Sequence, residues 1–156
     1  MSSTHSSLAS SPSLVGLFSW LVPGSGYFLL GERVRAIIAG VTIFALFLAG
    51  IFVGGIRIMD PPGWNSDDPS QSITSALIDS PIAQLSDKPW YVGQILCGPV
   101  TVATSAVSIH LAESGVPSSH SRSWEIGALY TAVAGMLNLL VIIDSAHRAS
   151  AIKSQG

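Results

Sequence analysis

The longest apolar stretches of this chain carry no charged side chain, and each is long enough to form a helix that crosses a bilayer. They cover residues 36–56, 89–109 and 126–143. The hydrocarbon core of a bilayer is about 30 Å thick, which takes roughly 20 helical residues to span. A segment inside lipid has to satisfy its own backbone hydrogen bonds, and this favours helices. With their flanking residues, the stretches predict transmembrane helices over 36–58, 89–112 and 126–146.

A fourth apolar stretch, residues 14–30, is interrupted. Pro23 cannot donate the helical hydrogen bond to the carbonyl of Ser19, and Gly24 and Gly26 weaken a helix further. Two arrangements fit this pattern. One is a short, kinked transmembrane helix, and the other is a half-helix that ends at Pro23 and turns back, with its turn buried by other helices. We therefore expect an all-α integral membrane bundle of three to four transmembrane helices.

Polar segments flank and separate these helices. Residues 1–13 are rich in serine and lack the basic residues with which a signal peptide begins, so we expect a disordered tail. Residues 59–88 are rich in proline, serine and aspartate, which predicts a polar loop in water. We expect residues 14–150 to form a single membrane domain, and residues 151–156 to be a short tail.

The composition argues against a soluble domain. Charged residues are only 10% of the chain, whereas soluble domains have about 25%. The formal net charge is −2 and no basic stripe is present, so we expect the lipid bilayer as partner and no nucleic acid. Cys97 is the single cysteine, which excludes an intrachain disulfide and predicts a buried thiol.

Residues 21–35, LVPGSGYFLLGERVR, combine glycines with a charged turn. A dinucleotide-binding loop would need a third glycine where Leu29 stands, and a Walker loop would need a Gly-Lys pair that the chain lacks. The stretch instead predicts a turn between two membrane helices. Gly31 permits the backbone that ends a helix, and Arg33 and Arg35 hold the turn in water.

These residues resemble known proteins. Pro23-Gly24-x-Gly26, Leu30-Gly31 and Arg35-Ala36 are similar to the glycine-rich first helix and charged turn of the two-transmembrane-helix domain. The whole chain resembles a family of small bacterial multi-pass membrane proteins of unknown function, through Gln94, Gly98 and residues 134–149. That resemblance implies this helix order and a membrane location, for which we expect the bacterial cytoplasmic (inner) membrane. It supplies no activity, ligand or cofactor.

Two kinds of residue inside the apolar stretches are candidates for function or packing. Gln94 and Asn138 are polar at membrane depth, where they either hydrogen-bond across the bundle or contribute to a ligand or ion site. Small residues also recur at a spacing of four, which lets helices approach closely within the chain or between copies. These are Gly50 with Gly54, and Ala128 with Ala132.

Catalytic and metal-binding patterns are weak. His110 and Glu113 are one helical turn apart, but a zinc site needs three or four converging ligands. Asp144 and Arg148 are four residues apart near a helix end, which is typical of a solvated ion pair. No serine lies in a nucleophile elbow. We therefore expect no catalytic residues, no metal, no cofactor and no enzymatic activity.

Two functions remain. The first is a structural, assembly or scaffolding role through helix packing, with a homo-oligomer or other membrane proteins as partners. The alternative is a small transporter or channel subunit in which polar residues line a path. A flux screen with reconstituted protein would separate them.

The basic residues do little to fix the orientation. With three spans, one side would carry Arg33, Arg35 and Arg122, and the other Arg57, Lys88, Arg148 and Lys153. These counts are too close for the positive-inside rule. The short basic turn over 31–35 and the acidic loop that follows the second helix favour a cytoplasmic turn and an outward-facing loop.

Overall fold

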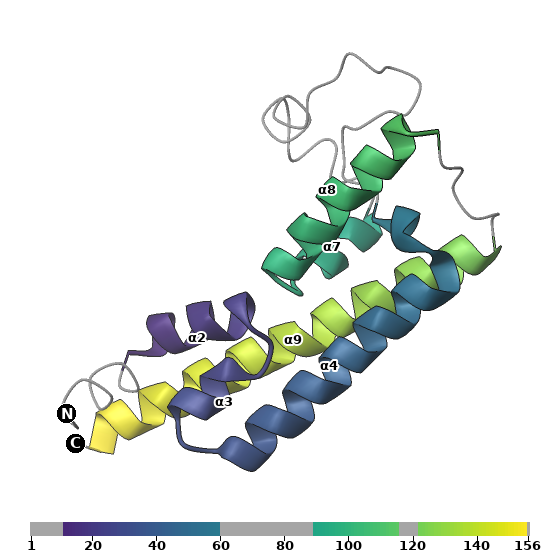
Figure 1. The fold of residues 1–156 in the computed structure, drawn as a ribbon. Coiled ribbons are helices and arrows are strands. Elements are labelled where there is room, and N and C mark those ends of the chain that lie inside the picture. Colours follow the sequence, from purple (N-terminus) through teal and green to yellow (C-terminus); the bar gives the residue numbers. More distant parts are fainter. Residues whose placement is uncertain (1–10, 60–88, 116–121, 156) are drawn as a thin grey trace.

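The computed structural model describes residues 11–59, 89–115 and 122–155. Within these ranges every regular element is a helix, as the all-α prediction requires (Figure 1). The elements are α2 (Pro12–Leu21), α3 (Ser25–Leu29), α4 (Arg33–Gly54), the short 3-10 helix η1 (Ile56–Ile58), α7 (Pro89–Ile95), α8 (Pro99–Glu113) and α9 (Arg122–Gln155). Most of the predicted tail and of the predicted loop, residues 1–10 and 60–88, lies outside the described residues.

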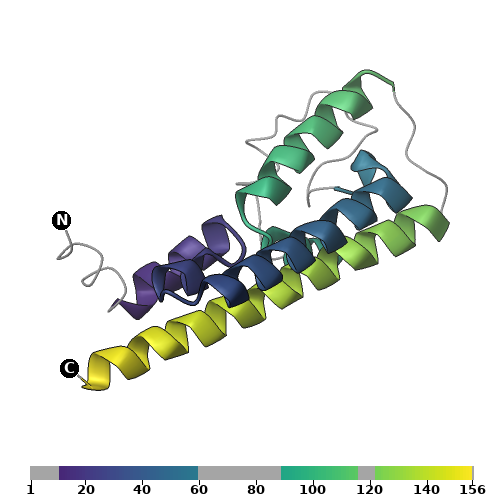
Figure 2. The ribbon, with the colours of Figure 1, turned by 60° about the horizontal axis from the view of Figure 1, so that its bottom comes forward.

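The two longest helices, α4 and α9, form an antiparallel pair that runs the length of the molecule (Figures 1 and 2). Gly54 of α4 lies against Gly127 near the start of α9, and Gly50 lies against Thr131 one turn further along. Within the described residues, these two helices are long and apolar enough to cross a membrane. The described residues thus contain two such helices, where three to four transmembrane helices were expected, because two of the expected helices are broken.

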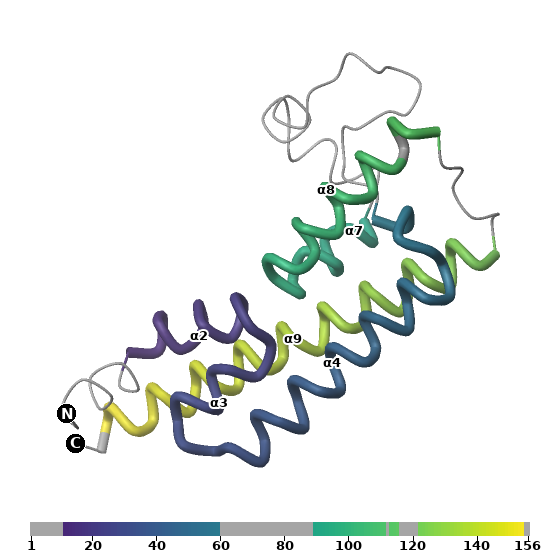
Figure 3. The backbone as a smooth tube through the Cα atoms, viewed as in Figure 1, coloured from purple at the N-terminus to yellow at the C-terminus, as the bar shows by residue number. Residues whose placement is uncertain are grey.

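The first broken helix is the one expected over residues 14–30. The structure has the second of the two arrangements: α2 ends at Leu21, and α3 runs back beside it (Figure 3). Pro23 has no amide to continue the helix, and Gly24 reverses the chain with a φ of +86°, a conformation that glycine adopts at no steric cost. This pair of helices is called the α2–α3 hairpin below.

The second broken helix is the one expected over residues 89–112. Here α7 ends at Ile95, and α8 begins at Pro99 after a tight turn. Gly98 has a φ of +80°, and proline disfavours helical backbone in the residue before it, so the helix cannot continue through this point. Proline then opens α8, since the first helical position needs no amide donor. This pair is called the α7–α8 hairpin below.

The other helix bounds differ from the expected ones at their ends. The helix expected over 36–58 begins at Arg33, and it ends at Gly54, because Gly55 has a φ of +78°. The helix expected over 126–146 runs from Arg122 to Gln155 and includes most of the predicted tail. The absence of charge marks the apolar part of a helix, but good helix formers such as alanine, arginine and lysine extend it into polar sequence.

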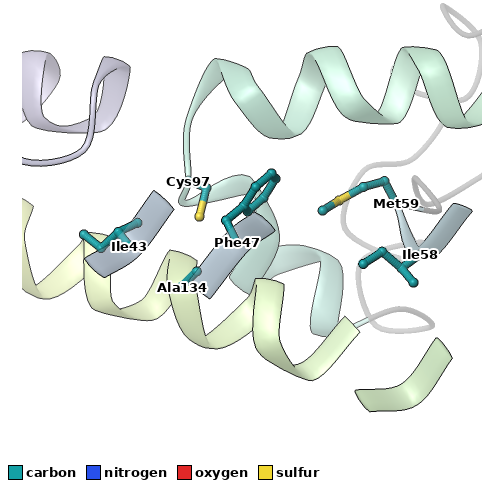
Figure 4. Packing of buried hydrophobic residues seen from close by; sticks show 6 residues of the cluster. All are labelled: Ile43, Phe47, Ile58, Met59, Cys97 and Ala134. Carbon is teal, nitrogen blue, oxygen red and sulfur yellow. The ribbon is translucent and has the colours of Figure 1, made fainter. Parts of the chain in front are cut away.

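The apolar core lies where α4, α9 and the α7–α8 turn meet. Figure 4 shows Ile43 and Phe47 of α4 beside Cys97 of the turn and Ala134 of α9. Ile58 and Met59 extend this cluster past the end of α4. The thiol of Cys97 is buried, as expected from its apolar surroundings in the sequence.

Candidate functional site

The tips of the two hairpins meet beside the middle of α9. The indole nitrogen of Trp20, in the last turn of α2, donates a hydrogen bond to the carbonyl of Ile95 at the end of α7, at 3.2 Å. A Cβ on Gly98 would collide with the carbonyl oxygen of Trp20. The contact between the tips therefore needs glycine at position 98 for reasons of space as well as of backbone conformation.

Asn138 of α9 joins both tips through one nitrogen. Its Nδ2 donates to the carbonyl of Ser19 at 3.3 Å and to the carbonyl of Leu96 at 2.8 Å. The Ser19 carbonyl is the acceptor that Pro23 leaves without its helical donor. Asn138 is fully buried, and its side chain supplies the donor that this backbone carbonyl lacks.

Gln94 holds α7 on α9. Its Nε2 donates to Oγ1 of Thr131 at 2.8 Å, and its backbone carbonyl accepts from Oγ1 of Thr101 of α8 at 2.5 Å. All three side chains are fully buried. The structure thus places both predicted polar candidates, Gln94 and Asn138, in hydrogen bonds between helices.

The side-chain oxygens of these two amides accept no hydrogen bond from the described residues. Oε1 of Gln94 and Oδ1 of Asn138 are buried, and neither accepts a hydrogen bond from the residues that the structure describes. An unpaired buried acceptor of this kind costs about 1–3 kcal/mol. These two atoms are the unfilled polar positions at the junction.

Close helix contacts surround the junction. A Cβ on Gly50 would lie 2.8 Å from the carbonyl oxygen of Gly127, and one on Gly54 would lie 3.0 Å from the Gly127 Cα. Ala132 lies against Gly93 of α7, and Ala128 is buried. The four predicted packing residues therefore lie at contacts within one chain. Sequence reasoning missed their partners, Gly93 and Gly127, because neither belongs to a pair of small residues that it singled out.

A polar cluster closes the end of the bundle that holds the 31–35 turn. Asp144 Oδ2 accepts from the hydroxyl of Tyr27 of α3 and from Nε of Arg148, both at 2.7 Å. Arg148 also pairs with Glu32 at 3.2 Å, and Glu32 pairs with Arg35 at 3.2 Å. The sequence predicted only the Asp144–Arg148 pair. Its extension to the α2–α3 hairpin and the turn joins residues more than a hundred positions apart, for which the sequence has no local signal.

The predicted break and turn residues occupy different surroundings. Pro23 and Gly24 form the tip of the α2–α3 hairpin, and Gly26 lies where a Cβ would collide with Oγ of Ser19. Gly31 has a φ of +81°, with open space around it. Arg33 is exposed and makes no ion pair or side-chain hydrogen bond with any residue in the described ranges.

The described residues do not gather metal ligands. His110 and Glu113 lie 4.0 Å apart and are both exposed, and no group of three or more histidine, cysteine, aspartate or glutamate residues in the described ranges could hold a metal ion. What the junction can do chemically is donate and accept hydrogen bonds through two amides and the carbonyls at helix ends.

Comparisons with known proteins place the chain in a family. No curated protein and no solved structure matches it. A family model matches residues 14–156, which include all the helices from α3 to α9, the whole junction and the polar cluster. The chain therefore belongs to the family of unknown function DUF6677.

Proposed function

We propose that the protein is a non-enzymatic, multi-pass integral membrane protein of the bacterial inner membrane, with a structural or assembly role. In this proposal α4 and α9 cross the bilayer, and the two hairpins enter it halfway from opposite faces. Helix lengths support this. The 22 residues of α4 extend about 33 Å and the 10 residues of α2 about 15 Å, against a hydrocarbon core of about 30 Å.

The surface of α4 supports insertion into lipid. Phe52 is 86% exposed, and Ile38 and Val41 are exposed on the preceding turns. Contiguous apolar surface of this kind is rare on soluble monomers. The non-helical backbone at the hairpin tips is covered by other helices, as lipid requires: Gly24 and Gly98 are both buried.

The hydrogen-bonded junction is the observation that carries the structural role. The hairpin tips contact each other directly, and the side chain of Asn138 of α9 donates hydrogen bonds to both tips. A solute that passed through this centre would have to part these contacts. The outer faces of α4, by contrast, offer apolar side chains to other membrane components.

A second candidate function, a transporter or channel subunit, is favoured by one specific observation. The free amide oxygens of Gln94 and Asn138 lie beside interrupted helices, and transporter sites at mid-membrane are built from such helices. A ligand or ion that bound these oxygens would offset the cost of leaving them unpaired.

A flux screen in liposomes separates the two functions. We expect proteoliposomes containing the full chain to release or take up ions and small solutes no faster than empty liposomes. Reproducible flux that Asn138→Leu abolishes would overturn the structural role and establish the transporter reading.

Photo-cross-linking in native membranes tests the assembly role. A photoreactive phenylalanine analogue at Phe52 should give discrete adducts with a membrane protein or with a second copy. The same analogue at Phe47, on the same helix but only 2% exposed, should react within the chain and is the matched control. Adducts with lipid alone at Phe52 would contradict the assembly role.

A further inference from the structure

An apolar groove runs along α4 on the side of the α2–α3 hairpin. Its deeper part has a volume of about 610 Å³ and lies between the hairpin tip, α4 and the start of α8. Its outer part, about 290 Å³, lies between Phe28 of α3 and α4. The two parts share Val22, Pro23, Ala36 and Ile37, so they form one continuous groove.

A cation lies next to this groove, one helical turn before the lining residue Ile37. Arg33 precedes Ile37 by four residues, which places both on one face of α4. Arg35 and Arg148 share the carboxylate of Glu32, whereas the exposed Arg33 is unpaired among the described residues. Arg33 is therefore an unpaired positive charge, among the described residues, on the same face of α4 as the groove.

The length of the groove matches one leaflet. The α4 residues that line the groove run from Ala36 to Leu48, a rise of about 18 Å, which is close to half of a hydrocarbon core of about 30 Å. Leu21 at the end of α2 and Val100 of α8 line the same part of the groove. A transmembrane helix of a partner would continue through both leaflets, whereas a lipid acyl chain ends at the bilayer centre.

We propose that this groove binds one anionic phospholipid, with an acyl chain along α4 and the phosphate at Arg33. Guanidinium groups bind phosphate through charge-assisted hydrogen bonds, and basic residues at a membrane surface attract anionic lipids. The inference rests on the proposed insertion of α4 into the bilayer. It assigns a ligand class to a groove that lies apart from the polar contacts of Gln94 and Asn138.

Native mass spectrometry of the detergent-purified full chain tests this proposal. Phosphatidylglycerol and phosphatidylcholine with the same acyl chains are added in turn. We expect the wild-type chain to bind phosphatidylglycerol about fivefold more tightly. Arg33→Gln should remove this preference. Arg122→Gln, which removes an exposed charge at the opposite end of α9, should retain it.

A second variant tests the groove independently of charge. Ala45 is exposed and lines the deeper part, so Ala45→Phe should fill the groove and weaken the binding of both lipids. Circular dichroism checks that each variant keeps its helices. Equal binding of the two lipids by the wild-type chain, an unaffected Arg33→Gln variant or an unaffected Ala45→Phe variant would overturn the proposal. So would the loss of a co-purifying protein, instead of lipid, in Ala45→Phe.

These outcomes are distinct from a failure of the proposed function. Absence of lipid preference leaves the flux and cross-linking results as they are. Recovery of the chain from membranes by carbonate without detergent would instead contradict the insertion on which both proposals depend.

Discussion

Asn138 donates a hydrogen bond to the carbonyl of Ser19, 119 positions away, which is the carbonyl that a proline has deprived of its helical donor. The same nitrogen reaches the carbonyl of Leu96. A single side chain in the middle of α9 thus satisfies a backbone acceptor in each of the two broken segments.

Replacement of Asn138 should destabilise the chain. Asn138→Leu removes the donor for one buried and one partly buried carbonyl, and we expect a loss of about 1–3 kcal/mol in the free energy of unfolding. Unfolding in mixed detergent, followed by circular dichroism, measures the loss. Leu140→Ala, at an exposed position on the same helix, should cost less than about 0.5 kcal/mol. Equal losses in the two variants would contradict the role of Asn138.

Two glycines with the same backbone conformation should respond differently to alanine. Gly31 and Gly98 have φ angles of +81° and +80°, but an added Cβ meets nothing at Gly31 and collides with the Trp20 carbonyl at Gly98. Gly31→Ala should cost about 1 kcal/mol from backbone strain alone. Gly98→Ala should cost about 2 kcal/mol more, because the hairpin tips must also separate. Similar melting temperatures for the two variants would show that the tips do not touch.

The polar cluster at the turn should be energetically coupled. Tyr27 and Arg148 both donate to Asp144 Oδ2, so Tyr27→Phe and Asp144→Asn remove parts of one network. We expect a coupling energy of about 0.5–1.5 kcal/mol in a double-mutant cycle. Tyr130→Phe, which changes an exposed tyrosine on α9, serves as control and should show no coupling to Asp144→Asn. Additive effects of Tyr27→Phe and Asp144→Asn would mean that the hydroxyl of Tyr27 is not coupled to Asp144.

The sequence predicted the helices that depend on length and composition alone. α4 and most of α9 follow from uncharged stretches. Pro23 with Gly24 correctly indicated a break in the stretch over residues 14–30. The sequence did not decide between a kinked helix and a chain that turns back, because this depends on whether α4 and α9 bury the turn. The return brings Gly24 so close to the backbone of Ala36 and Gly40 that a Cβ would collide there, and no local pattern encodes this approach.

The break in the stretch over residues 89–109 had a signal in the sequence, although that stretch carries no charge. Gly98 followed by Pro99 is a turn signature, but the length of the uncharged stretch favoured a continuous helix. Once that helix is broken, the described residues have two helices long enough to span a bilayer instead of three, and the C-terminal end of α9, not its start, lies beside the turn that precedes α4. The ion pair of Arg148 with Glu32 shows this arrangement directly, because it joins the C-terminal part of α9 to the turn that precedes α4.

The basic residues of the described ranges group differently from the sequence prediction. Arg33, Arg35, Arg148 and Lys153 share the end of the bundle that holds the turn, and Arg57 and Arg122 lie at the other. Lys88, the seventh basic residue, lies outside the described residues, so the counts alone do not decide the orientation, and the short basic turn over 31–35 remains the feature that favours a cytoplasmic turn.

Cysteine labelling in intact cells tests the two-span arrangement most directly. In a Cys97→Ser background, single cysteines are introduced as Val34→Cys beside the turn and Ser150→Cys near the end of α9; both positions are exposed. The structure predicts that an impermeant maleimide labels both from the same side, and the charge distribution predicts that this requires opened cells. Labelling of the two cysteines from opposite sides would mean that a third segment crosses the bilayer, and it would contradict the half-membrane hairpins.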